Sequence, residues 1–138
     1  MAIIQKGKIK MKLKARTINS GTASGIALVS KEPLSFFGMI DPETGKIIER
    51  GHELEGESIK DRILVFPYGK GSTVGSYVLY RLKKNNLAPR GIINSECEPI
   101  IAIGAIISDI PCVDKVDISR IKTNDKVTID NDLVVINE

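Results

Sequence analysis

The sequence predicts a single α/β domain with mixed strands and two helices in the middle of the chain. Most segments have the length and apolar content of short strands, whereas two central segments have helical character. No repeat and no separate linker interrupts them. A chain of 138 residues also fits one domain, because domains commonly span about 100–200 residues. We therefore expect residues 1–138 to fold as one unit.

The first predicted strand alternates between basic and apolar positions. Basic residues occupy every second position from Lys6 to Arg16, and small or apolar residues from Gly7 to Ala15 occupy the positions between them. Side chains of a strand alternate between its two faces, so the basic groups share one face. That face can bind an anion, or it can be a solvated face whose lysines discourage edge-to-edge pairing of sheets. We favour the solvated face.

A short strand and a turn follow. The polar residues 19–25 lead into a strand predicted at residues 26–29. The rings of Phe36 and Phe37 are expected to be exposed near a turn at residues 41–45. In this turn a proline presets the backbone and a glycine supplies a positive φ.

A buried strand and a helix form the clearest structural unit. The run Ile63–Phe66 is continuously apolar and is stopped by Pro67, which is typical of a strand buried on both faces. A helix is predicted over Thr73–Lys84, with Ser72 as its N-cap. The apolar residues that recur at helical spacing in this segment are Val74, Tyr77, Val78 and Leu82.

Three further elements complete the prediction. Ile92 and Ile93 form a short strand, and Pro99 then opens a helix that is apolar on every side as far as Ile107. Such a helix is expected to be buried. The chain ends in a β-hairpin from Val127 to Ile136.

The composition argues against several classes of protein. The net charge of +3, from 20 basic and 17 acidic residues, is too small to indicate a nucleic-acid partner. The longest apolar stretch, residues 99–107, has about half the length of a membrane span. The first residues lack the apolar core of a secretory signal. We expect a cytoplasmic protein that binds neither nucleic acid nor a membrane.

Two cysteines and one histidine are too few for a metal centre within this chain. Structural zinc sites take four ligands, and iron–sulfur clusters are held by several thiolates. Cys97 and Cys112 stand fifteen positions apart, with no CxxC pair. We interpret them as buried thiols, and we expect a partner to supply any metal centre that the chemistry needs.

The turn between the buried strand and the first helix is the strongest candidate for a functional site. Gly69 and Gly71 have no Cβ, so the backbone can approach a ligand closely. The first amides of a helix lack intrahelical partners and stabilise negative charge, and Ser72 places a hydroxyl there. The run Gly-Lys-Gly-Ser-Thr does not fit the P-loop spacing GxxxxGK[ST], so we reject nucleotide binding through it. An ordinary helix N-cap is the alternative interpretation.

The single histidine, His52, lies in a loop predicted at residues 51–58. A loop histidine can act as a general base or a phosphocarrier, but the sequence offers no supporting partner. We predict a non-catalytic surface role for it. The carboxylates Glu53, Glu55 and Glu57 alternate, as in a solvated face.

The run from Phe66 to Leu79 resembles the signature of the aconitase X swivel-domain family. Its most specific part is Gly-Lys-Gly-Ser-Thr-Val-Gly-Ser, residues 69–76. The resemblance implies a swivelling β/β/α domain that acts as the small subunit of a two-chain hydro-lyase. It extends over most of the chain, through residues 41–45, 51–58, 98–106 and 110–114.

In archaea, the stand-alone form of this domain is similar to the small subunit of an enzyme of a mevalonate route to isoprenoids. That enzyme removes water from (R)-5-phosphomevalonate and gives trans-anhydromevalonate 5-phosphate. The implied partners are a small phosphorylated hydroxy acid and a large subunit that carries a 4Fe-4S cluster on three cysteines. The resemblance thus implies that this chain binds no cofactor and no metal itself.

Carried over to this sequence, the proton-accepting serine of the family is Ser72. Gly71, Thr73 and Lys70 are the candidates for binding the substrate. Related aconitases follow the serine with an arginine for the substrate carboxylate, whereas Thr73 and Val74 stand here. Lys70 or the large subunit is therefore expected to recognise the carboxylate or the phosphate.

Two alternatives stay open. The chain can be the small subunit of another dehydratase of the same family, for example one that acts on hydroxyproline. It can also be a non-enzymatic mobile carrier or binding module. In that case His52 is phosphorylated, or the lysine-rich strand face docks an anionic partner.

Overall fold

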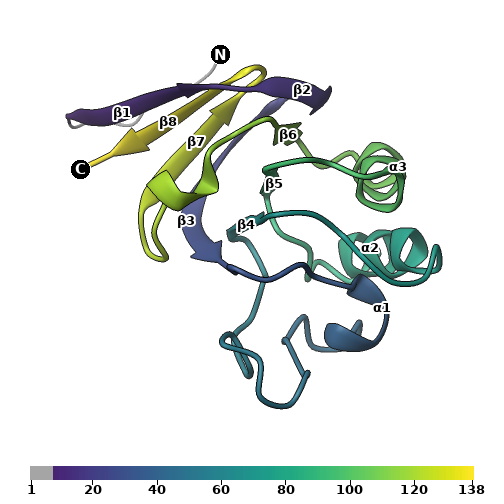
Figure 1. The fold of residues 1–138 in the computed structure, drawn as a ribbon. Coiled ribbons are helices and arrows are strands. Elements are labelled where there is room, and N and C mark those ends of the chain that lie inside the picture. Colours follow the sequence, from purple (N-terminus) through teal and green to yellow (C-terminus); the bar gives the residue numbers. More distant parts are fainter. Residues whose placement is uncertain (1–7) are drawn as a thin grey trace.

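A computed structural model describes residues 8–138, which form one curled sheet of eight strands with helices on one side (Figure 1). The strand order across the sheet is β1-β8-β7-β3-β4-β5-β6-β2. In chain order the elements are β1 (Ile9–Lys14), β2 (Arg16–Asn19), β3 (Thr22–Val29), α1 (Phe36–Met39), β4 (Ile63–Phe66), α2 (Gly75–Lys84), β5 (Gly91–Asn94), α3 (Pro99–Ser108), β6 (Cys112–Asp114), the 3₁₀ helix η1 (Ile118–Arg120), β7 (Lys126–Asp130) and β8 (Leu133–Asn137).

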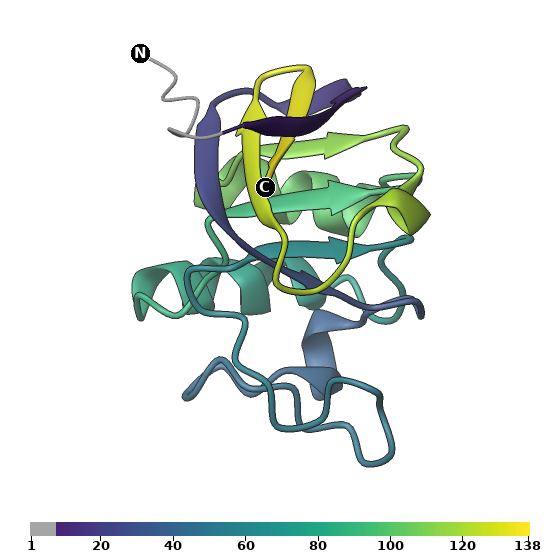
Figure 2. The ribbon, with the colours of Figure 1, turned by 90° about the vertical axis from the view of Figure 1, so that its left-hand side faces the viewer.

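The sheet divides into two layers, and the helices add a third. Strands β4, β5 and β6 run parallel to the second half of β3, and α2 and α3 lie on their outer side (Figures 1 and 2). Strands β1, β8 and β7 pair antiparallel and form the other strand layer with the first half of β3. Strand β3 belongs to both layers, because it pairs with β7 over Thr22–Ile26 and with β4 over Ala27–Val29. The predicted α/β class and the β/β/α layering are confirmed.

The central parallel strands are buried on both faces, against two apolar cores. In β4, Leu64 and Phe66 belong to the core under the helices, whereas Ile63 and Val65 belong to the core between the strand layers. All four side chains are fully buried. This division follows from the two-residue period of a strand, and it confirms the strand predicted from the continuous apolar run.

The basic N-terminal segment forms two strands, whereas the alternation predicts one. Strand β1 pairs with β8 and β2 pairs with β6, at opposite ends of the strand order, so this segment closes the curl of the sheet. Within β1, Met11 and Leu13 pack against the core and the lysines between and beside them are exposed. The predicted two-faced strand is confirmed there, while Lys6 and Gly7 lie outside the described residues.

Two local predictions need correction. Strand β3 begins at Thr22, because small polar residues that the sequence assigns to a loop pair with β7. Phe36 is buried in the core under the helices, and only Phe37 of the two rings is exposed. Both rings lie in the irregular segment α1, which no periodicity predicts. The C-terminal hairpin is confirmed as β7 and β8.

Helix α3 begins where predicted but is less buried than its sequence suggests. Pro99 takes the first helical position, and the Glu98 carboxylate accepts the N–H groups of Ile100 and Ile101, each at 2.8 Å. No further layer of the described chain covers the outer side of the helix, so apolar side chains remain there. The isoleucines Ile103, Ile106 and Ile107 are 53%, 54% and 44% exposed.

Candidate functional site

The turn predicted to be functional lies at the carboxyl edge of the parallel strands. Strand β4 ends at Phe66, and residues 67–74 carry the chain to α2. Strands β4, β5 and β6 all point toward this edge (Figure 2). Ligands of α/β sheets bind beyond the carboxyl ends of the strands. The four predicted site residues are all exposed at this turn: Lys70, Gly71, Ser72 and Thr73.

Ser72 lies one tight turn ahead of helix α2. Its carbonyl accepts the N–H of Gly75 at 2.9 Å, and its Oγ accepts the N–H of Val74 at 3.1 Å. The next bond, from the N–H of Ser76 to the Thr73 carbonyl, has the same 3₁₀ spacing. The regular helix therefore begins at Gly75 rather than at Thr73, and Ser72 caps the tight turn instead of α2 itself.

Several hydrogen-bond donors at this turn have no acceptor within the described chain. They are the backbone amides of Gly71, Ser72 and Thr73. Lys70 is exposed, and it makes no ion pair with any described residue. Consecutive free amides and a nearby cation stabilise negative charge, whether on a deprotonated Ser72 hydroxyl or on an anionic group of a ligand.

The two glycines of the turn are required by the packing of the chain itself. Gly71 has a φ of +90°, which favours glycine, and a Cβ there would overlap with Ser35 Oγ. A Cβ on the buried Gly69 would overlap with Glu98 Oε1 and Ile101 Cγ1. The turn is thus wedged between the segment before α1 and the start of α3. The sequence reasoning missed Ser35, because no pattern links a distant serine to this turn.

His52 is buried, so its predicted surface position is wrong. The residue is 6% exposed, its Nδ1 accepts the N–H of Leu54 at 3.0 Å, and its Nε2 lies 3.5 Å from Ser30 Oγ. These contacts tie the loop at residues 51–58 to the end of β3. A phosphocarrier needs an accessible ring nitrogen, and this arrangement does not offer one. The carboxylates beside His52 in the sequence are exposed, as predicted.

The two thiols belong to residues near helix α3 in the sequence: Cys97 precedes α3, and Cys112 is the first residue of β6. Cys112 is fully buried, as predicted, whereas Cys97 is only partly buried. The hydrogen bond with Cys97 and burial both raise the pKa of Cys112, so its thiol stays protonated at neutral pH. In residues 8–138 no three His, Cys, Asp or Glu side chains are grouped as a metal ion requires. Two cysteines also do not fit a four-iron cluster.

A buried carboxylate beside these thiols links the neighbouring strands β6 and β2. Asp114 accepts two hydrogen bonds from the Arg16 guanidinium, at 2.9 and 2.8 Å, and one from the N–H of Cys97 at 2.7 Å. Burial raises the pKa of Asp114, but these hydrogen bonds outweigh it and hold the pKa below its usual value. The contact is structural, because it pins β2 to β6.

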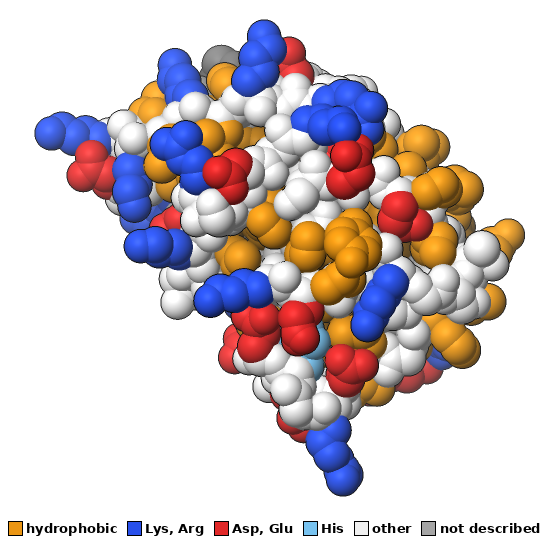
Figure 3. Space-filling model, in the orientation of Figure 1, with side chains coloured by type: hydrophobic (Ala, Val, Ile, Leu, Met, Phe, Trp, Pro, Cys, Tyr) orange, Lys and Arg blue, Asp and Glu red, His pale blue; other side chains and the backbone are white. Residues whose placement is uncertain are grey.

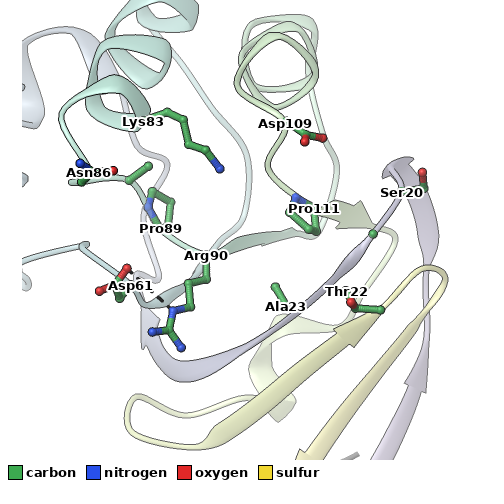
Figure 4. Close-up of a pocket in the computed structure, with 12 residues that line it drawn as sticks. Ser20, Thr22, Ala23, Asp61, Lys83, Asn86, Pro89, Arg90, Asp109 and Pro111 are labelled. Atoms are coloured by element: carbon green, nitrogen blue, oxygen red, sulfur yellow. Dashed lines mark ion pairs between the residues drawn. The ribbon is translucent and has the colours of Figure 1, made fainter. Parts of the chain in front are cut away.

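A polar pocket lies at the opposite, amino edge of the strands (Figure 4). It has a volume of about 490 Å³, and Lys83 and Arg90 reach into it. Asp61 Oδ1 lies 3.8 Å from Arg90 Nε, and Asp109 also lines the pocket. The two carboxylates therefore balance the charges of Lys83 and Arg90. The pocket is separated from Ser72 by the length of the strands. The sequence carries no signal for it.

In the described part of the chain, no helix has the length and apolar character needed to cross a membrane. The expectations of a cytoplasmic location and of no nucleic-acid partner stay predictions.

Comparisons with known proteins agree on one family. A sequence model of the aconitase X swivel domain matches residues 12–137. The phosphomevalonate dehydratase small subunit of Thermococcus kodakarensis is 59% identical over 122 residues, which cover 88% of this chain and 92% of that protein. The protein of the same name from Methanocaldococcus jannaschii is 53% identical over 126 residues, covering 91% and 96%. The crystal structure of Thermococcus kodakaraensis aconitase X, in its holo-form, superimposes with a TM-score of 0.91 at 56% identity. It covers 93% of this chain and 99% of that one.

Proposed function

The chain belongs to the aconitase X swivel-domain family, and we propose that it is the small subunit of a phosphomevalonate dehydratase. Relatives that are 52–59% identical over most of the chain carry that name. In this proposal the enzyme removes water from (R)-5-phosphomevalonate and forms trans-anhydromevalonate 5-phosphate, on a mevalonate route to isoprenoids. The observation that carries the proposal is the exposed Ser72 hydroxyl at the carboxyl edge of the sheet, held by the N–H of Val74.

Ser72 is the proton acceptor of the proposed reaction. Elimination of water takes a proton from one carbon and a hydroxyl group from its neighbour, and the C–H electron pair becomes the new double bond. A serine oxygen accepts that proton only if its deprotonated form is stabilised. The N–H of Val74 already donates to Oγ, and a donor to the charged form lowers a pKa. The neighbouring free amides act in the same direction.

The substrate is anionic, and the same turn offers groups that suit it. The amides of Gly71 and Thr73 and the ammonium of Lys70 are the candidates of this chain for binding the carboxylate or the phosphate. Lys70 is a point charge on a flexible stem, which suits a phosphate whose position is set by other contacts. The remaining contacts belong to the large subunit.

The large subunit completes the proposed site. An exposed turn cannot exclude water by itself, and closure of a second chain over it strengthens every electrostatic interaction within. We place the 4Fe-4S cluster expected for this family on that subunit, because the cysteines of this chain do not fit it. Such a cluster would supply a Lewis acid for the departing hydroxyl group.

Replacement of the proposed base tests the function. We expect Ser72→Ala to lower kcat by about 10³-fold with phosphomevalonate, while the complex with the large subunit still forms. The matched control is Ser20→Ala, an exposed serine in the turn at the opposite edge of the sheet, which should retain full activity. An active Ser72→Ala variant would refute the catalytic role. Turnover of hydroxyproline but not of phosphomevalonate by the unmodified pair would refute the substrate.

A further inference from the structure

An apolar groove lies beside the turn that carries Ser72. It has a volume of about 340 Å³ and runs between α1, the following loop and the start of α2. Four large apolar side chains that line it are well exposed: Phe37 (54%), Ile48 (52%), Val74 (44%) and Tyr77 (70%). A grouped exposure of this kind in a folded domain marks an interaction surface more often than scattered apolar residues do.

The groove and the Ser72 turn form one continuous surface. Val74 lines the groove with its side chain and donates its backbone N–H to Ser72 Oγ. The next residue, Gly75, packs against the groove wall, since a Cβ there would lie 3.7 Å from Phe36 Cβ and 3.8 Å from the Phe37 nitrogen. A body that covers Ser72 closely enough to exclude water therefore also meets the groove.

The charges around the groove favour an uncharged occupant. At its rim Arg81 pairs with Glu43, and the Asp41 carboxylate accepts the N–H of Glu43 at 2.9 Å. These groups are already engaged, so the groove offers little to a phosphorylated substrate. Exposed lysines and arginines crowd over the antiparallel strands, at the left of Figure 3, whereas hydrophobic side chains gather over the helices at its right. The helical side is thus the better surface for an apolar contact.

We propose that the large subunit inserts an apolar side chain, aliphatic or aromatic, into this groove when it closes over Ser72. The inference rests on the proposed function, because a large subunit is implied by the names of the relatives. Because Val74 lines the groove and also donates its N–H to Ser72 Oγ, docking at the groove would hold the large subunit next to the Ser72 turn.

Polar or charged substitutions in the groove test the proposal with the assembled pair. Tyr77→Glu introduces a helix-compatible charge at a side chain that is mostly exposed, so the fold is retained, and Phe37→Ser provides a second groove variant. Binding of each variant to the large subunit is measured by titration calorimetry. We expect each groove variant to raise Kd by about 30-fold or more, the effect of losing an interface hot spot. The control Ile106→Glu, equally apolar and exposed on α3, should change Kd less than about threefold.

The outcomes separate this proposal from the proposed function. Turnover that returns to the unmodified kcat when the Tyr77→Glu subunit is saturating supports a docking role. Unchanged Kd in both groove variants overturns the proposal. A rise in KM for phosphomevalonate with an unchanged Kd between the two subunits also overturns the proposal. The proposal is equally overturned if two copies of this chain form a homodimer that Tyr77→Glu dissociates. If Ile106→Glu raises Kd as much as the groove variants do, the proposal is overturned, and docking is assigned to the outer face of α3. An unmodified pair that binds but does not dehydrate phosphomevalonate refutes the function and leaves the groove result standing.

Discussion

Replacing Gly71 with alanine perturbs the turn that carries Ser72 without touching the serine. The new Cβ faces two obstacles. The backbone φ of +90° is unfavourable for a residue with a side chain, and Ser35 Oγ occupies the position of the methyl group. Ser35 Cβ is also only 3.0 Å from that position, so rotation of the hydroxyl alone does not relieve the overlap. We therefore expect both the stability of the chain and the geometry of Ser72 to suffer.

The magnitude follows from these two contributions. A positive φ costs a non-glycine residue about 1–2 kcal/mol. Displacing Ser35 also breaks the hydrogen bond from its hydroxyl to the Phe37 carbonyl, at 2.8 Å, which contributes about 1 kcal/mol. Gly51→Ala is the matched control, because Gly51 has a φ of +84° and no atom lies within 4 Å of its Cβ position. We expect Gly71→Ala to lower the free energy of unfolding by about 2–3 kcal/mol and Gly51→Ala by about 1–2 kcal/mol.

Two assays check this reasoning. Denaturant titration of each variant gives the free energy of unfolding, and turnover with the large subunit gives kcat. A displaced Ser72 should lower kcat by about 10²-fold in Gly71→Ala, since a misplacement of about 1 Å has that effect. The Gly51→Ala variant should keep its kcat. If Gly71→Ala is no less stable than Gly51→Ala and fully active, the packing of Ser35 against this turn does not constrain Ser72.

Two further predictions concern stability. Because hydrogen bonds from Arg16 and from the Cys97 amide lower the pKa of Asp114 in the folded chain, its carboxylate stabilises the fold above its unfolded pKa of about 3.9. That stabilisation is lost as the pH falls through the lower folded pKa. Denaturant titrations between about pH 5 and pH 2 should show a steeper loss of stability in the unmodified chain than in Asp114→Asn, and parallel pH profiles would contradict this. Leu64→Ala removes a fully buried side chain under the helices and should lower the free energy of unfolding by about 3 kcal/mol. The control Tyr80→Ala removes a partly exposed side chain and should change this free energy by less than about 1 kcal/mol. Equal effects of the two substitutions would contradict the assigned core.

Features that depend on neighbours in the chain were predictable from the sequence. The continuous apolar run Ile63–Phe66, stopped by Pro67, predicted a strand buried on both faces, and in the structure its side chains do contribute to both cores. Pro99 marked the start of a helix, because proline is favoured at the first helical position. The C-terminal hairpin followed from two apolar runs around a short polar turn. In each case the cause acts over a few residues.

Features that depend on distant contacts were not predictable in the same way. The alternation from Lys8 to Arg16 does not say that the chain changes its partner strand at Ala15. The burial of His52 depends on Ser30 and the end of β3, which the loop sequence does not contain. Likewise, the outer isoleucines of α3 are exposed because no part of the described chain reaches them.

The sequence by itself determined the glycine-rich turn, its serine and the family to which the chain belongs, since these depend on residue types at fixed spacing. Only the tertiary structure decided that Ser35 underlies Gly71, that Val74 holds the Ser72 oxygen, and that an apolar groove continues from that turn. The physical reason is that spacing along the chain sets local backbone geometry. Exposure and contact, in contrast, depend on which distant segments pack together.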